Sequence, residues 1–357
     1  MDPRIDLTLN VFKVFGLAAL SFIGALLWTP LLTNFLYKHK MWRKAARTEA
    51  ADGTKTPMFN ALHKERETTV PRMGGLLIWI TTGGLAFGLY ALSGLTDISL
   101  FDKLNFVSRN QTWLPLVTLL AAALLGLCDD VIQVYGRGSY RGGGMGLRQR
   151  IVLVLVIAAL GAYWFHFRLG WDTLYLPGVG DITIGLWYLP LFVITMLAMF
   201  AGGVIDGLDG LAGGVYAAMF AAYGGIAFFQ NQLDIAAFCA VVLGALLAFL
   251  WFNIPPARFY LGETGMLGLT TGITVVAFLT NSVAVLPIIA FLPAVEIFSV
   301  LLQFASKRWR GKKIFLIAPI HHHFEALGWP AYKVTMRFWV VGVMCAITGM
   351  VIALIGK

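Results

Sequence analysis

Charged side chains are scarce in this chain. Asp, Glu, Lys and Arg make up 13% of its 357 residues, whereas hydrophobic residues make up 59%; a soluble domain has about 25% charged residues. No water-soluble fold could bury so large an apolar fraction, so the composition excludes a soluble enzyme. It predicts one integral membrane domain over residues 1–357, because apolar helices pack into a single bundle in lipid.

Cysteine is nearly absent as well. The three cysteines, Cys128, Cys239 and Cys345, lie in or beside apolar runs, and no two of them form a CxxC pair. This spacing argues against a disulfide framework and against a cysteine zinc site. We expect all three to be packing residues.

A small-residue cleavage site is missing after the first apolar run, which is far longer than the core of a signal peptide. We therefore expect that run to stay as a membrane anchor. Ten runs are long enough to cross about 30 Å of hydrocarbon, which takes about 20 helical residues. The sequence thus predicts an all-α polytopic membrane protein with ten transmembrane helices. Their approximate ranges are 11–36, 73–93, 113–132, 150–167, 183–204, 211–230, 235–252, 265–281, 283–304 and 334–355.

The positive charges predict the orientation of these helices. With ten spans both termini lie on one side, and the connecting loops alternate between the two faces. Twenty Lys and Arg fall on one face, against five on the other with its tails. The positive-inside rule makes the richer face cytoplasmic and puts both termini on the periplasmic or extracellular side. The net charge of +9 therefore reflects topology, and we expect no nucleic-acid partner. The richer face consists of 38–72, 133–150, 253–264 and 305–333.

Two prolines, Pro287 and Pro293, fall inside the ninth predicted span. A proline removes a backbone donor and its ring clashes with the preceding turn. We expect the ninth helix to be broken there and to open a lateral groove to lipid.

Acidic residues gather at the predicted cytoplasmic face. The third span ends with the adjacent pair Asp129 and Asp130, which is costly at a membrane edge unless it is paired or bound to a cation. Carboxylates at a helix C-terminus also oppose the helix dipole, and a bound cation would relieve them. The alternative is that both are solvated residues at a helix boundary.

The fifth span ends in a second acidic motif, Asp206-Gly207-Leu208-Asp209-Gly210. On a helical turn Asp206 and Asp209 would share a face, and the glycines would let a ligand approach the backbone. The alternative, compatible with the first, is a turn in which Asp209 is the N-cap of the sixth span.

The loop after the seventh span carries Asn253, Tyr260 and Glu263. Asn253 and Tyr260 suit a polar, aromatic pocket for a nucleotide base, and Glu263 supplies a fifth carboxylate. The alternative is a polar loop with Pro and Gly as turn residues. The glycine-rich stretch 136–146 lacks the GK[ST] ending of a P-loop. We interpret it as a flexible loop that could contact phosphate through Arg137, Arg141, Arg148 or Arg150.

The last predicted cytoplasmic loop contains three consecutive histidines, His321, His322 and His323, after a basic segment. Three histidines in a basic loop indicate an anion or metal site. Oxygen-rich carboxylate sites favour Mg²⁺, which substrate phosphates usually complete, whereas histidines with few carboxylates favour zinc. Five acids predict Mg²⁺. Glu296, inside the ninth span, is either a functional group or a paired structural residue.

Together these motifs resemble those of the phospho-N-acetylmuramoyl-pentapeptide transferase family, within the larger group of polyprenyl-phosphate N-acetylhexosamine-1-phosphate transferases. The resemblance runs from Met73-Gly74-Gly75 to Arg337-Phe338-Trp339. It rests on Asp129-Asp130, on Asp206-Gly-Leu-Asp209-Gly-Leu, on the Phe252-Asn253 loop ending at Gly262-Glu263-Thr264-Gly265, and above all on Pro319-Ile-His-His-His-Phe-Glu325.

The resemblance implies ten transmembrane helices, a Mg²⁺-dependent cytoplasmic site, a bacterial plasma membrane location and a homodimer. By this resemblance the catalytic candidates are Asp129, Asp130, Glu263, His321, His322 and His323, of which the three acids would hold the metal and the histidines would handle diphosphate. The candidate substrate-binding residues are Asp206, Gly207, Asp209, Asn253, Tyr260, Arg72 and Arg150.

Four departures from the family pattern touch these motifs. Gln133 stands where the family usually has Lys, Gly203 replaces an Asn, and Glu263 replaces an Asp. The segment 68–73 departs from the usual Gly-Thr-Pro-Thr-Met, and its Pro71-Arg72 is more like the related GlcNAc-phosphate transferases.

The implied function is transfer of phospho-MurNAc-pentapeptide from UDP-MurNAc-pentapeptide to undecaprenyl phosphate, which gives lipid I and UMP for peptidoglycan. The alternatives are a GlcNAc-1-phosphate transferase that uses UDP-GlcNAc, an inactive relative that binds the lipid carrier, and a secondary transporter. A transporter would carry its ionisable residues near the midplane of broken helices within repeats. Here the acids are predicted at helix ends on one face, and we find no repeat.

Overall fold

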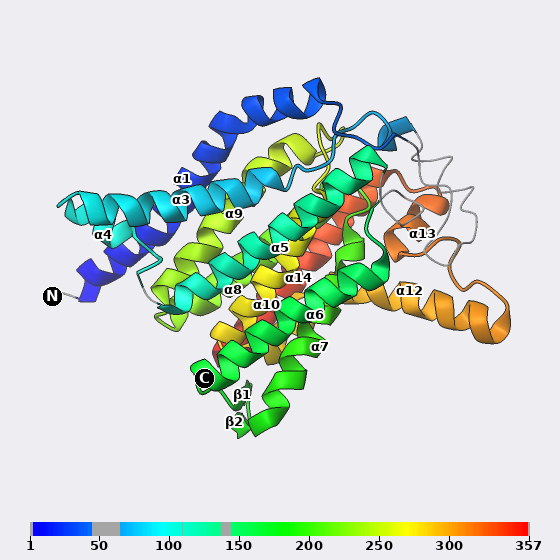
Figure 1. Ribbon diagram of the computed structural model, residues 1–357. Coiled ribbons are helices and arrows are strands. Elements are labelled where there is room, and N and C mark those ends of the chain that lie inside the picture. Colours follow the sequence, from blue (N-terminus) through cyan, green and yellow to red (C-terminus); the bar gives the residue numbers. More distant parts are fainter. Residues whose placement is uncertain (1–2, 45–64, 109, 137–143, 356–357) are drawn as a thin grey trace.

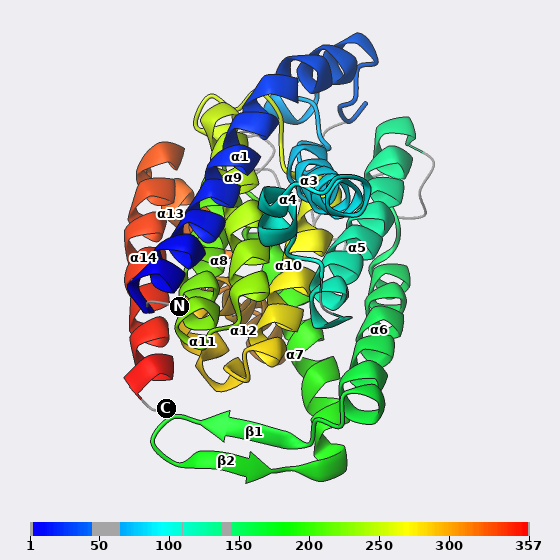
Figure 2. The same ribbon diagram turned by 90° about the vertical axis from the view of Figure 1, so that its left-hand side faces the viewer.

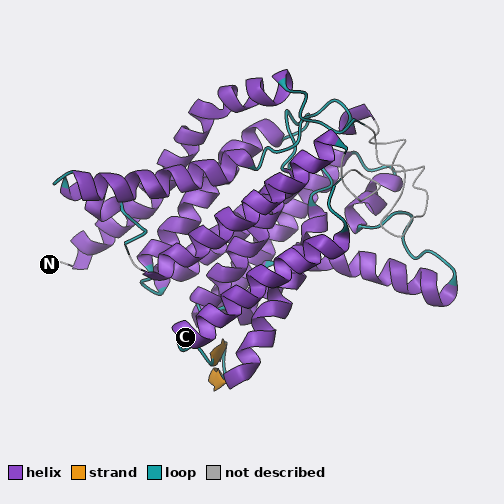
Figure 3. Ribbon diagram, in the orientation of Figure 1, coloured by secondary structure: helices purple, strands orange, loops and turns teal. Residues whose placement is uncertain are grey.

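The computed structural model describes residues 3–44, 65–108, 110–136 and 144–355, and in this part of the chain it is a bundle of helices (Figures 1 and 3). The helices of the first half are α1 (Pro3–Lys38), α3 (Leu76–Leu95), α4 (Ser99–Leu104), α5 (Asn110–Tyr135), α6 (Leu147–Tyr163) and α7 (Tyr188–Gly202). Those of the second half are α8 (Leu211–Phe229), α9 (Leu233–Asn253), α10 (Gly262–Leu279), α11 (Leu286–Ile289), α12 (Phe291–Arg310), α13 (Ile320–Ala326) and α14 (Ala331–Ile355).

Short elements complete the bundle. A two-stranded antiparallel hairpin joins α6 to α7, with Thr173 opposite Thr183. Its strands are β1 (Thr173–Leu176) and β2 (Gly180–Thr183), and the short helical turns are η1 (Trp164–Arg168), η2 (Gly185–Trp187), η3 (Gly203–Ile205) and η4 (Val283–Val285).

The predicted membrane spans are confirmed. Within the described residues nine helices are long and apolar enough to cross a membrane, and one bent pair of helices makes up to ten. The protein is thus an all-α polytopic membrane protein. The observed ends differ from the predicted ones by a few residues; α10, for example, begins at Gly262.

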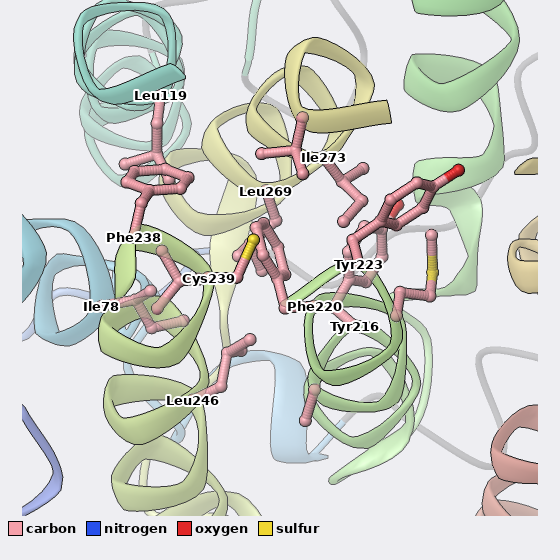
Figure 4. Close-up of a cluster of buried hydrophobic side chains, with 14 of the residues drawn as sticks. Ile78, Leu119, Tyr216, Phe220, Tyr223, Phe238, Cys239, Leu246, Leu269 and Ile273 are labelled. Atoms are coloured by element: carbon pink, nitrogen blue, oxygen red, sulfur yellow. The ribbon is translucent and has the colours of Figure 1, made fainter. Parts of the chain in front are cut away.

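The core lies around α8, α9 and α10. The most apolar window of α10 is 94% buried, whereas that of α1 is only 22% buried, so α10 is central and α1 is peripheral. Apolar and aromatic side chains interlock between these helices (Figure 4). The residues labelled there are Ile78, Leu119, Tyr216, Phe220, Tyr223, Phe238, Cys239, Leu246, Leu269 and Ile273. Cys239 is one of them, as expected for a packing cysteine; Cys128, by contrast, is exposed and Cys345 is half-buried, so the expectation holds for Cys239 alone.

The charge that interrupts the first apolar run is paired. Lys13 Nζ lies 2.7 Å from Asp234 Oδ1 at the start of α9, and it donates to the carbonyl of Asn105 at 3.2 Å. A lone ammonium in lipid would be costly. This pair removes that cost and fixes α1 against α9.

The ninth span is broken, as predicted. The segment Val283–Ile289 and α12 meet at an angle of 73°, and the break falls at Ala290. In a continuous helix the ring of Pro293 would clash with the carbonyl four residues earlier, that of Ile289, which explains the position of the break. Beyond it α12 projects away from the bundle (Figure 1). An apolar pocket of about 280 Å³ lies along it, lined by Phe291, Ala294, Val295, Phe298, Ser299, Leu302, Phe315 and Ile320.

The end of α14 lies near the hairpin, the start of α1 lies apart from it but away from α13, and α13 lies at the opposite end of the bundle (Figures 1 and 2). This agrees with an even number of spans. The compartment that each end faces stays a prediction from the positive charges.

Candidate active site

Asp129 and Asp130 lie inside α5, not at its end. The helix continues to Tyr135, so more than one further turn follows the acidic pair. Both side chains are fully buried. The alternative of a solvated helix boundary is therefore wrong, and each carboxylate needs partners of its own.

The partners of Asp129 come from three segments. Its Oδ2 lies 2.6 Å from Arg150 Nη2 on α6 and accepts a hydrogen bond of 2.9 Å from Gln133 Nε2, one turn along α5. Its Oδ1 accepts from the backbone N–H of Met145 at 2.5 Å. These contacts hold the Asp129 carboxylate in one orientation.

Asp130 faces another side of α5. Its Oδ1 lies 3.4 Å from Arg72 Nε, and its Oδ2 accepts from the backbone N–H of Thr264 at 2.9 Å. Successive helical residues point about 100° apart. The two adjacent aspartates therefore have different cations and different neighbouring elements.

Glu263 lies in the first turn of α10, not in the preceding loop as predicted. An acid in the first turn is favoured by the positive end of the helix dipole. Its Oε1 accepts from Arg150 Nη1 at 2.5 Å, so Arg150 bridges Glu263 and Asp129. Helices α5 and α10 approach closely because residue 126, on α5, is glycine. A side chain at Gly126 would collide with the backbone of Glu263 on α10.

Arg72 and Arg150 supply the positive charge among these acids. Burial acts to lower the pKa of Arg72, but the nearby carboxylates, first among them Asp130, outweigh it and raise that pKa above its ordinary value. Arg72 therefore stays a cation in a mostly buried position.

The motif at 206–209 forms a turn between η3 and α8, so the expectation that Asp206 and Asp209 share a helical face is wrong. Asp129, Asp130 and Glu263 form what we call the acidic cluster. Asp206 is half-buried and faces this cluster. Burial raises the pKa of its carboxyl to about 7, Arg72 acts against that shift, and the negative charge of Glu263 adds to it.

Asp209 faces away from the acidic cluster. Its Oδ2 lies 2.6 Å from Arg66 and accepts from the backbone N–H of Ala257 at 3.1 Å. It is not the N-cap of α8, because Gly210, with φ of +76°, occupies that position. Asp209 thus braces the loop around Ala257 against the segment that precedes α3.

Asn253 and Tyr260 shape the same loop. The Asn253 side chain accepts from the N–H of Gly210 and donates to the carbonyl of Phe259, both at 2.8 Å. Its amide is therefore engaged within the chain. Tyr260 exchanges backbone hydrogen bonds with the Arg72 segment, at Pro71 and Gly74, and burial raises the pKa of its phenol.

His321 lies on the short helix α13 and is fully buried. Its Nδ1 lies 2.9 Å from Oε2 of Glu296 on α12, a close polar contact without the direction of a hydrogen bond. Glu296 therefore has the structural partner that the sequence left open. The ring of His321 packs on the turn at 206–209, where a side chain at Gly207 would collide with it. This contact sets α13 beside Asp206.

The other two histidines also have partners. His322 Nδ1 lies 2.6 Å from Glu325 Oε2, and His323 Nδ1 accepts from the backbone N–H of Leu316 at 3.2 Å. His321 and His322 nevertheless have adjacent rings, with centroids 4.1 Å apart, and the Nε2 atoms of both face Gly207, whereas His323 turns toward Leu316.

The oxygen-rich cluster fits a Mg²⁺ ion better than a zinc ion. Among the described residues no three His, Cys, Asp or Glu side chains form a site that could hold an ion by themselves. Mg²⁺ usually takes only one or two carboxylates and completes its shell with water and phosphates. Glu263, whose side chain is 23% exposed, and the aspartates beside it can supply such ligands, with Arg72 and Arg150 as the present counter-charges.

The sequence did not point to Arg43, Arg66 or the role of Gln133. Arg43 Nη2 donates to Gln133 Oε1 at 2.5 Å, and Arg43 is 5% exposed. A basic loop residue usually lies in solvent, so the sequence carried no signal for its burial. The predicted phosphate contacts of Arg137 and Arg141 lie outside the described residues.

The comparisons with known proteins decide the family. A model of the family "Glycosyl transferase family 4" matches residues 112–281. Curated proteins named phospho-N-acetylmuramoyl-pentapeptide-transferase match most of the chain. The protein of Geobacillus sp. strain WCH70 is 34% identical over 93% of this chain and 95% of its own, and that of Levilactobacillus brevis is 35% identical over 80% and 84%. The protein of Listeria innocua is 33% identical over 95% and 98%.

The chain belongs to the phospho-N-acetylmuramoyl-pentapeptide transferase family. The stretch matched by the glycosyl transferase model contains Asp129, Asp130, Asp206 and Glu263, so the acidic cluster lies within it. The resemblance derived from the motifs is thereby confirmed, and the family is one of transferases.

Proposed function

We propose that this protein transfers phospho-MurNAc-pentapeptide from UDP-MurNAc-pentapeptide to undecaprenyl phosphate in peptidoglycan synthesis. The family membership supports the reaction. The observation that carries it to these residues is the gathering of Asp129, Asp130, Glu263, Arg72 and Arg150 at one end of the bundle.

The reaction exchanges one phosphorus–oxygen bond for another. An oxygen of the carrier phosphate attacks the sugar-linked phosphorus of the donor, and the bond from that phosphorus to UMP breaks. The second pKa of a phosphate monoester is about 6, so the acceptor is largely dianionic at neutral pH and needs no general base. Negative charge develops on UMP, and Arg72 and Arg150 are placed to bind phosphate oxygens as it does.

Full burial and fixed partners make the two aspartates poor nucleophiles. Asp129 and Asp130 are both enclosed and bound to arginine and backbone N–H groups. This supports direct attack by the acceptor over a covalent aspartyl-phosphate route. In the proposed mechanism they act on the acceptor phosphate through the counter-charges that they hold, Arg150 and Arg72.

We propose Mg²⁺ as the cofactor, held by Glu263 with Asp129 or Asp130. The oxygen donors support this choice. When bound, the ion would neutralise charge on the diphosphate. Asp206, with His321 and His322, whose rings lie beside the neighbouring Gly207, would then contact the rest of the donor.

The proposed location is the bacterial plasma membrane, with the site at the cytoplasmic face. The positive-inside count supports this orientation, because Asp129, Asp130 and Glu263 lie near the ends of α5 and α10 that adjoin Lys- and Arg-rich segments. A homodimer stays a prediction from the family resemblance.

The sugar is tested with two donors. Purified protein is incubated with undecaprenyl phosphate, Mg²⁺ and either UDP-MurNAc-pentapeptide or UDP-GlcNAc, and UMP release is measured. We expect UMP only with the first donor, and none from the Asp130→Asn variant, which serves as the control. Release with UDP-GlcNAc alone would favour the GlcNAc-phosphate reaction, and release with neither donor would remove both.

A further inference from the structure

The Asp129 carboxylate is joined to a distant arginine through one side-chain amide. Arg43 Nη2 donates to Gln133 Oε1 at 2.5 Å, and Gln133 Nε2 donates to Asp129 Oδ2 at 2.9 Å. All three residues are at most 5% exposed. Arg43 lies after α1, 90 residues before Gln133, so this chain of hydrogen bonds connects the first helix to the acidic cluster.

The chemistry of the three groups allows only one arrangement. A guanidinium has donors alone and an ionised carboxylate has acceptors alone. The Gln133 amide must therefore turn its oxygen to Arg43 and its N–H to Asp129. Without Arg43 the amide could rotate and present its oxygen to the carboxylate, which would repel Asp129. A guanidinium on the amide oxygen also polarises the N–H and strengthens its hydrogen bond.

Arg43 is held in place by the segment that precedes α3. Its Nη1 lies 3.3 Å from Glu67 Oε1. Two residues earlier, the carbonyl of Met41 accepts from the backbone N–H of Arg72 at 2.8 Å. The segment after α1 therefore contacts both halves of the site, Arg72 on the Asp130 side and Gln133 on the Asp129 side.

We infer that Arg43 is a positioning residue of the transfer reaction, acting through Gln133 to orient Asp129. This inference rests on the proposed function. It explains how Gln133 can stand where the family usually has Lys: the positive charge is supplied one side chain farther away. It also predicts that a lysine at 133 makes Arg43 dispensable.

The test is a set of single and double variants assayed for UMP release. Arg43→Met should lower kcat about 10- to 100-fold, the usual range for a group that orients a ligand at one remove, with KM for both substrates changed less than about twofold. Adding Gln133→Lys to Arg43→Met should restore kcat at least about tenfold. Adding Arg43→Met to Asp129→Asn should cost almost nothing further, because the group that Arg43 orients is already lost.

Lys13→Met is the matched control. It removes a partly buried, paired cation near the other end of the same bundle, about 30 Å away along α9 at 1.5 Å per residue. We expect it to lower the thermal midpoint of unfolding as Arg43→Met does, while its kcat stays at the wild-type level.

A second readout needs no turnover. The thermal midpoints of Arg43→Met, Gln133→Leu and the double variant should be non-additive, because the two side chains contact one another. The positioning role would be overturned if the losses of kcat from Arg43→Met and Asp129→Asn added fully in the double variant. It would also be overturned if Gln133→Lys did not restore the kcat of Arg43→Met, or if the changes in thermal midpoint from Arg43→Met and Gln133→Leu were additive. Wild-type protein that releases no UMP would instead refute the proposed function.

Discussion

Asp129 and Asp130 are neighbours in the sequence, yet their carboxylates contact different arginines, Arg150 and Arg72. The 100° step of the helix sends one toward α6 and the other toward the segment before α3. Asp130 thereby has Arg72 as its cation, whereas Asp129 shares Arg150 with Glu263. Two adjacent acids can consequently do different work in one reaction.

Asn substitution should separate these two roles. A positioned charge in a water-excluded site is worth about two to four orders of magnitude in rate, roughly 2.7 to 5.5 kcal/mol. We expect Asp129→Asn and Asp130→Asn each to lose that much kcat, measured by UMP release. Raised Mg²⁺ should partly restore one of them and not the other. Near-normal turnover in both would show that the pair is structural.

Glu263 gives a test of the metal. Its carboxylate is partly exposed and is paired with Arg150. Removal of Mg²⁺ with a chelator should abolish turnover. Glu263→Ala should lose most activity, and Glu263→Asp should keep part of it because the carboxylate remains. An active Glu263→Ala enzyme would rule this residue out as a ligand.

The Asp206 carboxyl should make stability depend on pH. In the folded protein its pKa is about 7, against an ordinary value of 3.8. Between these values the folded state binds a proton that the unfolded chain has released, so stability falls as pH rises through this window. The thermal midpoint of the wild type should therefore fall more from pH 5 to pH 8 than that of Asp206→Asn. Parallel curves would contradict the raised pKa.

The orientation of the bundle can be tested by labelling. Single cysteines replace Lys312, after α12, and Thr183, in the hairpin, in a chain whose native cysteines are changed to alanine. Both positions are exposed. An impermeant thiol reagent should reach Thr183→Cys in intact cells and Lys312→Cys only in inverted vesicles. Labelling of both from one side would overturn the topology.

The membrane spans were predictable because the thickness of the hydrocarbon core sets the minimum number of consecutive apolar residues in each spanning helix. The break before Pro293 was predictable for a similar reason, since a missing donor acts locally. The directions of Asp206 and Asp209 were not, because they depend on a turn that ends in the left-handed conformation of Gly210. A three-residue spacing predicts a shared face only if the backbone is helical.

Contacts between distant segments escaped the sequence altogether. The pairs Arg43–Gln133 and Arg66–Asp209 join residues more than 80 positions apart. Burial of an arginine depends on which helices pack together, and no periodicity records it. The same holds for Glu296 and His321, each of which was singled out without its partner.

The close contact between Gly126 and the backbone of Glu263 fixes the point from which the Glu263 side chain extends. Because α5 and α10 already touch there, neither backbone can shift to absorb a longer acid at the start of α10. The length of the Glu263 side chain therefore sets how far its charge reaches from this fixed backbone, and it reaches Arg150. An aspartate there, held by the same fixed backbone, would have a shorter reach toward Arg150.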